Sequence, residues 1–175
     1  MKKILKKTYF SYIKLIAIFL LLFAIFKGVF VLFVLFGLSL AVSFLVNNFP
    51  IRNLGIELVT FIAVLTGWKY GPLPALIITF ILITYHMVAG GFLGNYVLWV
   101  IPAYCVAALI AGFLPQIGIV TLGITITIGI NLNNVIFTAL TSPGYLPKYL
   151  IFVITNILFN VLLFTTIAEP VFFFI

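Results

Sequence analysis

The chain has 175 residues, of which 66% are hydrophobic and only 6% are charged, and its formal net charge is +7. From Tyr70 to Pro147 it contains no Lys, Arg, Asp or Glu. This composition excludes a soluble fold, because a folded domain could not keep such a surface hydrated, and it indicates that lipid surrounds most of the chain. The long unbroken apolar runs exclude a β-barrel, whose strands alternate polar and apolar residues, and predict membrane-spanning helices.

The positive charge is concentrated in the first fourteen residues, which contain five lysines. A basic N-terminal segment followed by apolar sequence predicts a cytoplasmic N-terminus in contact with anionic lipid headgroups, and it argues against nucleic-acid binding. The single Cys105 lies inside an apolar run, so we predict neither a disulfide framework nor a thiolate metal cluster. The apolar stretch that follows is longer than a signal-peptide core and lacks a clean cleavage site, so we expect it to be retained.

Residues 1–27 are predicted to form a basic, partly interfacial N-terminal helix, and residues 28–175 a single transmembrane helical bundle. The first apolar run is interrupted only by Lys27-Gly28, contains no proline, and offers too few residues for a hairpin. This favours one continuous or kinked helix with the first span at 28–46. The alternative is two separate spans, 9–26 and 29–46, which would give seven crossings.

Turn signals divide the rest of the chain into five further apolar segments. The signals are the polar stretch 47–53, the turn at 68–72, Gly90-Gly91, Pro115-Gln116 and Ser142-Pro143-Gly144. The predicted spans are 55–68, 72–89, 95–113, 117–140 and 146–168. We therefore predict an all-α, polytopic membrane helix bundle with about six transmembrane helices, seven being possible.

With six crossings and a cytoplasmic N-terminus, Lys69 falls on the inside, and Arg52 and Lys148 fall on the outside. This distribution agrees with the positive-inside rule, although the seven-crossing alternative satisfies the rule as well. We expect a multi-pass protein of the cell membrane.

Polar side chains from several predicted spans fall toward the same side of the membrane, which is external in the six-crossing arrangement. Polar groups in a bilayer are costly unless they are paired or hydrated, so this convergence predicts a hydrated ligand pocket. Hydrogen bonding between packed helices is the alternative. The predicted substrate-binding residues are Glu57, His86, Asn95, Trp99, Asn131, Asn134 and Asn156.

Individual members of this set are open to several interpretations. Glu57 could bind a cationic group, pair with Arg52, or face the positive N-terminal end of its own helix. His86 has no neighbouring acids or cysteines and makes a poor metal site. Trp99 could stack on a flat ligand or anchor the interface. No catalytic constellation and no phosphate-binding loop occur, so we predict a protein that is not an enzyme and has no cofactor.

The predicted arrangement resembles the substrate-binding S component of energy-coupling-factor transporters. The local resemblance is Gly67-Trp68-Lys69-Tyr70-Gly71-Pro72-Leu73-Pro74-Ala75, which is similar to a Gly-Pro turn of that family. The family's Ala-x-x-x-Ala docking motif has its nearest counterpart in Gly37 and Ala41. The resemblance implies a vitamin-like substrate bound on the outer side, with a transmembrane coupling subunit and ATPases supplied in trans. The segment 9–26 departs from the family pattern.

The span layout and glycine-rich turns also resemble MreD-type membrane scaffold proteins, which would be non-catalytic and have no ligand. A third interpretation is a membrane protein whose polar groups only tie its helices together. A hydrated pocket would distinguish the S-component interpretation from the other two, because a scaffold has no need of one.

Overall fold

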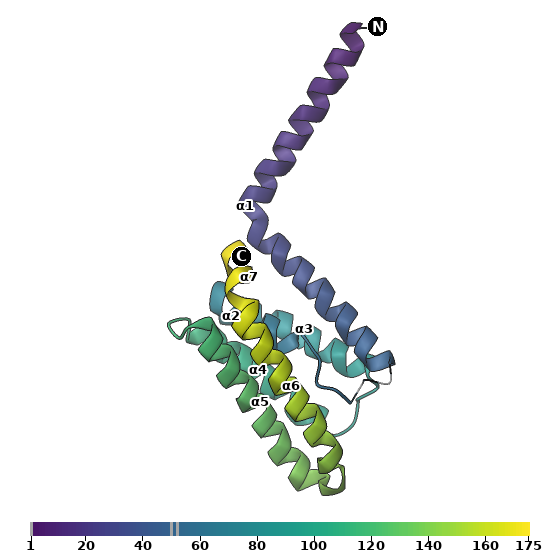
Figure 1. Ribbon diagram of the computed structural model, residues 1–175, viewed down its shortest axis with the longest axis vertical. Helices are drawn as coiled ribbons and strands as arrows, with labels where there is room; N and C mark the ends of the chain where they lie inside the picture. The colour runs from purple at the N-terminus through teal and green to yellow at the C-terminus, as the bar shows by residue number, and fades with distance from the viewer. Residues whose placement is uncertain (1, 50, 52) are drawn as a thin grey trace.

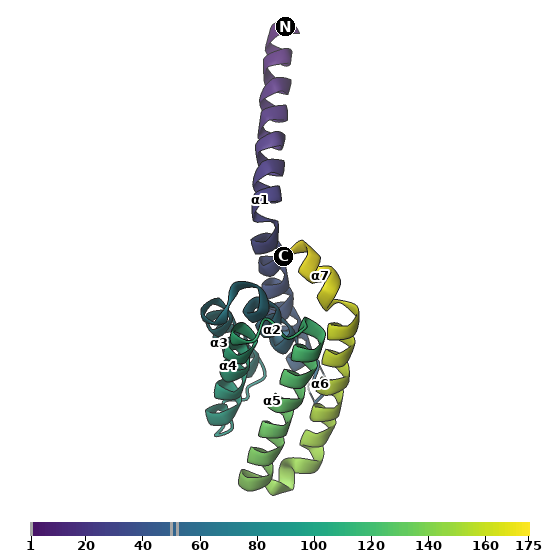
Figure 2. The same cartoon turned by 90° about the vertical axis from the view of Figure 1, so that its left-hand side faces the viewer.

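The computed structural model of the protein describes residues 2–49, 51 and 53–175, so Arg52 lies outside the described residues. Every regular element among these residues is helical, which confirms the all-α prediction. Figures 1 and 2 show the arrangement. The helices are α1 (Lys2–Asn48), α2 (Val59–Tyr70), α3 (Pro72–Ala89), α4 (Val97–Phe113), α5 (Ile119–Thr141), the 3-10 turn η1 (Pro143–Tyr145), α6 (Leu146–Thr166) and α7 (Ala168–Phe174).

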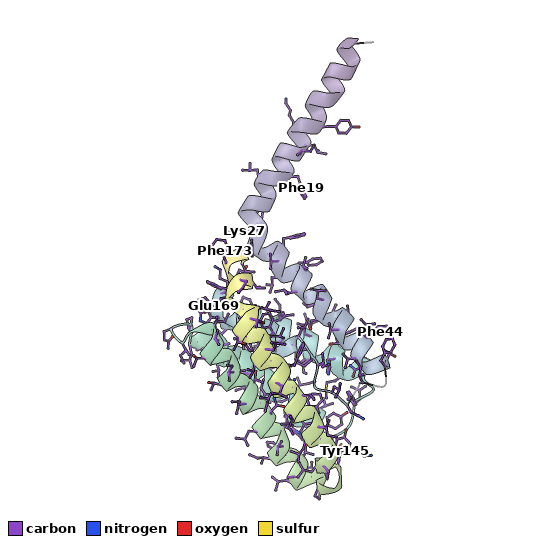
Figure 3. All side chains as sticks on the ribbon, in the orientation of Figure 1. Phe19, Lys27, Phe44, Tyr145, Glu169 and Phe173 are labelled. Atoms are coloured by element: carbon purple, nitrogen blue, oxygen red, sulfur yellow. The ribbon has the colours of Figure 1, made fainter. Side chains whose placement is uncertain are left out.

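The polarity of the bundle is the reverse of that of a soluble protein. Large apolar side chains such as Leu98, Phe33 and Leu140 are more than 70% exposed, whereas several Ser, Thr and Asn side chains are buried. The exposed Phe44 and Phe173 are labelled in Figure 3. In the described part of the chain, four helices are long and apolar enough to cross a membrane: Phe26–Asn48, Pro72–Ala89, Ile119–Thr141 and Pro143–Thr166. The apolar α4 is shorter. The protein is therefore a membrane-embedded helical bundle.

Helix α1 passes through Lys27-Gly28 without a hairpin and bends at Phe26, whose φ of −106° and ψ of 16° are not helical. Its first half projects away from the bundle, and its second half packs along it (Figure 1). Glycine is needed at position 28, because a Cβ there would lie 2.5 Å from the carbonyl oxygen of Ile175. The structure thus confirms the predicted kinked helix.

Helix α2 is the central element of the bundle, and every residue from Val59 to Gly67 is buried. It packs mainly against α3 and α4. Gly67 allows α2 and α4 to approach closely, because a Cβ at this position would lie only 2.8 Å from the Ala111 Cβ. Its twelve residues extend about 18 Å. This is well short of a hydrocarbon layer of about 30 Å.

The predicted span 55–68 was wrong at its start, because residues 55–58 are not helical. Side chains of α6 satisfy the backbone of Gly55 in place of helical bonds. The Gly55 N–H donates to Thr155 Oγ1 at 2.8 Å, and Asn156 Nδ2 donates to the Gly55 carbonyl at 2.8 Å. Non-helical backbone at membrane depth is tolerated when protein surrounds it in this way.

The C-terminal end also differs from the prediction. The last span was expected to reach residue 168, with an apolar tail behind it. Instead α6 ends at Thr166, and the tail forms the short helix α7.

Successive helices alternate in direction from α1 to α6, because short turns connect them. The α1–α2 loop, the α3–α4 turn and the α5–α6 turn therefore share one end of the bundle, opposite the C-terminus (Figures 1 and 2). In the α3–α4 turn Gly91 has a φ of +64°, a conformation that favours glycine.

Candidate functional site

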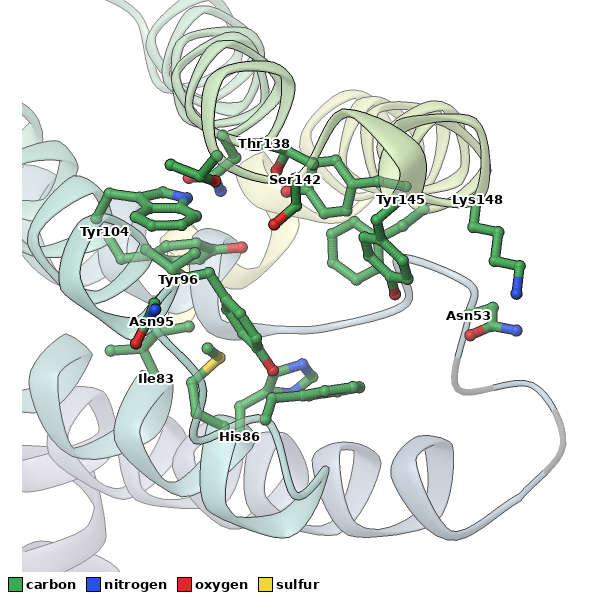
Figure 4. Close-up of a pocket in the computed structure, with 18 residues that line it drawn as sticks. Asn53, Ile83, His86, Asn95, Tyr96, Tyr104, Thr138, Ser142, Tyr145 and Lys148 are labelled. Atoms are coloured by element: carbon green, nitrogen blue, oxygen red, sulfur yellow. The ribbon is translucent and has the colours of Figure 1, made fainter.

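A cavity of about 410 Å³ lies at this end of the bundle (Figure 4). Its lining comes from α3, α4, α5 and α6, together with the turns that connect them and Asn53 of the α1–α2 loop. A volume of this size falls within the range of about 300–1,000 Å³ that is typical of small-molecule sites. No residue of α2 contributes to the lining.

Aromatic side chains dominate the walls of the cavity. The Trp99 ring stacks on Phe137 with a centroid distance of 5.6 Å, and the Tyr149 ring stacks on Phe152 at 5.6 Å. Such pairing holds the rings in fixed orientations and leaves flat apolar faces available to a ligand. The aromatic lining residues are Phe92, Tyr96, Trp99, Tyr104, Tyr145, Tyr149 and Phe152.

Polar groups are distributed among these rings. The Trp99 ring lines the cavity, and its Nε1 is buried without a hydrogen-bond partner. The Tyr149 hydroxyl lies within hydrogen-bonding reach of the Asn134 side chain. Lys148 and Asn53 lie near each other at one end of the cavity, and Tyr104 lies toward the other (Figure 4). A ligand would meet fixed donors and acceptors and a single ammonium group among the described lining residues.

The structure divides the predicted site residues into two groups. Four of them line the cavity: His86, Asn95, Trp99 and Asn134. The other three, Glu57, Asn131 and Asn156, are buried outside the lining and belong to a hydrogen-bonded network.

The tyrosines of the lining are not among the predicted site residues. Their position in the sequence, near helix ends that also contain asparagines, could have indicated them. A buried tyrosine needs a polar partner for its hydroxyl, and asparagine can provide one. Four of them line the cavity: Tyr96, Tyr104, Tyr145 and Tyr149.

Glu57 is the centre of the network and is only 1% exposed. Its Oε2 accepts a hydrogen bond from the Thr60 N–H at 3.0 Å. Its Oε1 accepts from Thr60 Oγ1 at 2.6 Å and from Asn156 Nδ2 at 3.2 Å. The carboxylate therefore faces the first turn of α2, which was one of its predicted roles. Three donors on one carboxylate make its burial tolerable, and they also occupy it.

Asn156 connects the network across three elements. Its Oδ1 accepts from Asn131 Nδ2 of α5 at 2.7 Å, while its Nδ2 reaches both Glu57 and the Gly55 carbonyl. Asn131 Nδ2 also donates to the Thr127 carbonyl at 2.8 Å. Asn131 and Asn156 thus bond between helices. The network borders the cavity through Tyr104, a lining residue whose side chain lies near Thr60.

His86 is 6% exposed and lines the cavity from α3. Its Nδ1 lies 3.0 Å from Ser43 Oγ of α1. Asn95 is an exposed residue of the α3–α4 turn, close to the start of α4. The ring of His86 and the amide of Asn95 therefore border the cavity from two consecutive segments of the chain.

Comparison with protein-family models, with curated proteins and with solved structures finds no match to this chain. The functional proposal below therefore depends on the cavity and on the residues that line it.

We predict that Asn156→Leu destabilises the protein. The substitution leaves the buried Gly55 carbonyl without a partner, and it removes one of the two bonds made by Glu57 Oε1 and one of the two made by Asn131 Nδ2. Each unsatisfied buried group costs about 1–3 kcal/mol, so the melting temperature should fall clearly. Thermal unfolding in detergent or nanodiscs measures the effect. Asn133→Leu is the matched control, because Asn133 is half-buried on α5 and has one long bond of 3.3 Å. Equal melting temperatures for the two variants would contradict the network's structural role.

Proposed function

We propose that this protein is a membrane-embedded substrate-binding subunit that takes up a small nutrient together with a separate energy-coupling module. The observation that carries this proposal is the cavity of about 410 Å³ at one end of the bundle. In the network beneath it, the carboxylate of Glu57 and the amides of Asn131 and Asn156 already bond to protein groups. The lining, in contrast, keeps a buried indole N–H without a partner. An aromatic-lined cavity outside that network favours ligand binding over a purely structural role.

The lining favours a small ligand that is uncharged or zwitterionic and vitamin-like. Amide side chains such as Asn95 and Asn134 provide both donors and acceptors, and Trp99 provides a stacking face. Lys148 is exposed, and the negative charge of Glu57 is buried beneath the cavity. One cation near the mouth and one acid below disfavour a ligand that carries several charges of one sign. The resemblance to S components of energy-coupling-factor transporters agrees with this substrate class.

The energy for uptake would come from partners. The sequence contains no phosphate-binding loop, so a transmembrane coupling subunit and ATPases would act in trans. We place their docking face on α1, where Gly37 and Ala41 are exposed and nothing lies within 4 Å of a Cβ built on Gly37. Two small residues four apart allow a partner helix to approach closely. In this proposal the N-terminus is cytoplasmic and the cavity faces outward from the cell membrane.

We predict that a small molecule copurifies with the protein and that the same compound raises its melting temperature. A ligand that binds only the folded state stabilises it by mass action. Mass spectrometry of extracts identifies the compound, and a thermal-shift screen of vitamins verifies it.

The two tryptophans provide a matched test of where that compound binds. Trp99→Phe should weaken its binding about 2- to 10-fold, because the smaller ring offers less surface for stacking. Trp68→Phe should leave binding unchanged, because the Trp68 N–H bonds to the Ile117 carbonyl outside the cavity. If no compound copurifies or shifts the melting temperature, the scaffold reading takes the place of this one.

We also predict that Gly37→Leu together with Ala41→Leu abolishes copurification of the coupling subunit and ATPases from native membranes. The new side chains would block close helix approach, while the fold should tolerate them because both positions are exposed. Quantitative mass spectrometry of the purified complex measures the loss. Gly129→Leu is the control, since Gly129 is exposed on α5 with nothing within 4 Å of its Cβ position. Retained copurification in the double variant would show that the partner docks elsewhere.

A further inference from the structure

One wall of the cavity is backed directly by α1. His86 lines the cavity from α3, and its Nδ1 lies 3.0 Å from Ser43 Oγ of α1. Both residues are buried, with exposed fractions of 6% and 1%. Figure 4 shows the His86 ring on the cavity wall, with the ribbon of α1 passing behind α3. One side chain therefore contacts both the site and the helix outside it.

A second contact repeats this connection one turn further along α1. Asn47 Nδ2 donates to the backbone carbonyl of His86 at 3.2 Å. Asn47 Oδ1 is buried without a partner and lies 2.8 Å from the Cβ position of Gly90, in the turn that leads to the lining residue Phe92. The end of α1 thus supports both α3 and the turn that follows it.

The interface between α1 and α3 is polar but incompletely bonded. Ser39 and Ser43 are four residues apart and hence on one face of α1, and Asn47 continues that face. Ser39 Oγ is buried without a partner. Only 17% of the α1 span is buried. An interface with few protein contacts and with unsatisfied polar groups would cost little to rearrange if one of its bonds changed.

The imidazole offers a specific way to transmit a change. In a neutral histidine one ring nitrogen donates and the other accepts. If Ser43 donates to Nδ1, then Nε2 carries the proton and acts as a donor. If Nδ1 donates to Ser43, then Nε2 is an acceptor. A group in the cavity that binds Nε2 therefore fixes the direction of the bond to α1.

We propose that His86 couples occupancy of the cavity to the position of α1, through Ser43 and Asn47. The docking face formed by Gly37 and Ala41 lies on the opposite side of the same helix, so a shift of α1 would be presented directly to a partner. That consequence rests on the proposed function. The coupling itself is a property of the fold and can be tested without knowing the ligand, since coupling between two sites is reciprocal.

The first test measures how fast a thiol in the cavity is modified when α1 carries a substitution. Thr138→Cys places a reporter thiol on the cavity wall, in a Cys105→Ala background that removes the native cysteine. The rate of its modification by methanethiosulfonate ethylammonium is measured in nanodiscs. Adding Ser43→Ala should change this rate about fivefold or more, in line with typical coupling factors. Adding Ser39→Ala should not change it. Both serines are buried on the same face of α1, but Ser39 has no hydrogen-bond partner.

The reverse test measures hydrogen exchange in α1 when a group attached inside the cavity fills it. Attaching a benzyl methanethiosulfonate group to the Thr138→Cys variant should change hydrogen exchange over residues 39–48, and Ser43→Ala should remove that response. Ser142→Cys, on the exposed rim, serves as a second reporter, and Asn47→Ala as a second perturbation. Unchanged rates at both reporters in folded Ser43→Ala and Asn47→Ala proteins would overturn the coupling. The proposed function would fail separately, by the absence of any copurifying or stabilising compound.

Discussion

A stretch of non-helical backbone inside a membrane protein must find all its hydrogen bonds without help from water. In this chain that stretch precedes α2, and Thr155 and Asn156 of α6 bond to both backbone groups of Gly55. Because this segment is fixed, α2 can begin at Val59, well inside the bundle. The cavity lies beyond that start, lined by the four longer helices around it, and its Tyr104 contacts Thr60 in the first turn of α2.

The polar side chains at this end of the bundle have two different roles. Glu57, Asn131 and Asn156 bond to one another or to backbone and hold the helices together. The side chains above them border open volume. This division reconciles the two predicted explanations for intramembrane asparagines, since helix ties and cavity lining coexist as separate layers. It also keeps the Glu57 carboxyl inside the network and out of the cavity lining.

The sequence predicted the helices and most of their turns, because hydropathy, glycine and proline are local signals. It did not predict where α2 begins, because the partners of Gly55 are about one hundred residues away in the chain. The sequence also could not show that Asn131 and Asn134 have different roles. The two lie three residues apart on α5, yet one bonds to α6 and the other lines the cavity. That difference depends on how α5 is rotated against its neighbours, which packing decides. The contact between His86 and Ser43 was hidden for the same reason.

The central claim is that a satisfied network around Glu57 supports a cavity that a small molecule occupies. An experimental structure of the protein in lipid nanodiscs, purified without adding ligand, tests it most directly. The account predicts Glu57 bonded to Thr60 and Asn156, with density for a compact molecule between Trp99 and Tyr149. A bundle whose side chains have collapsed to fill that volume, or a cavity occupied by a lipid acyl chain, would contradict it.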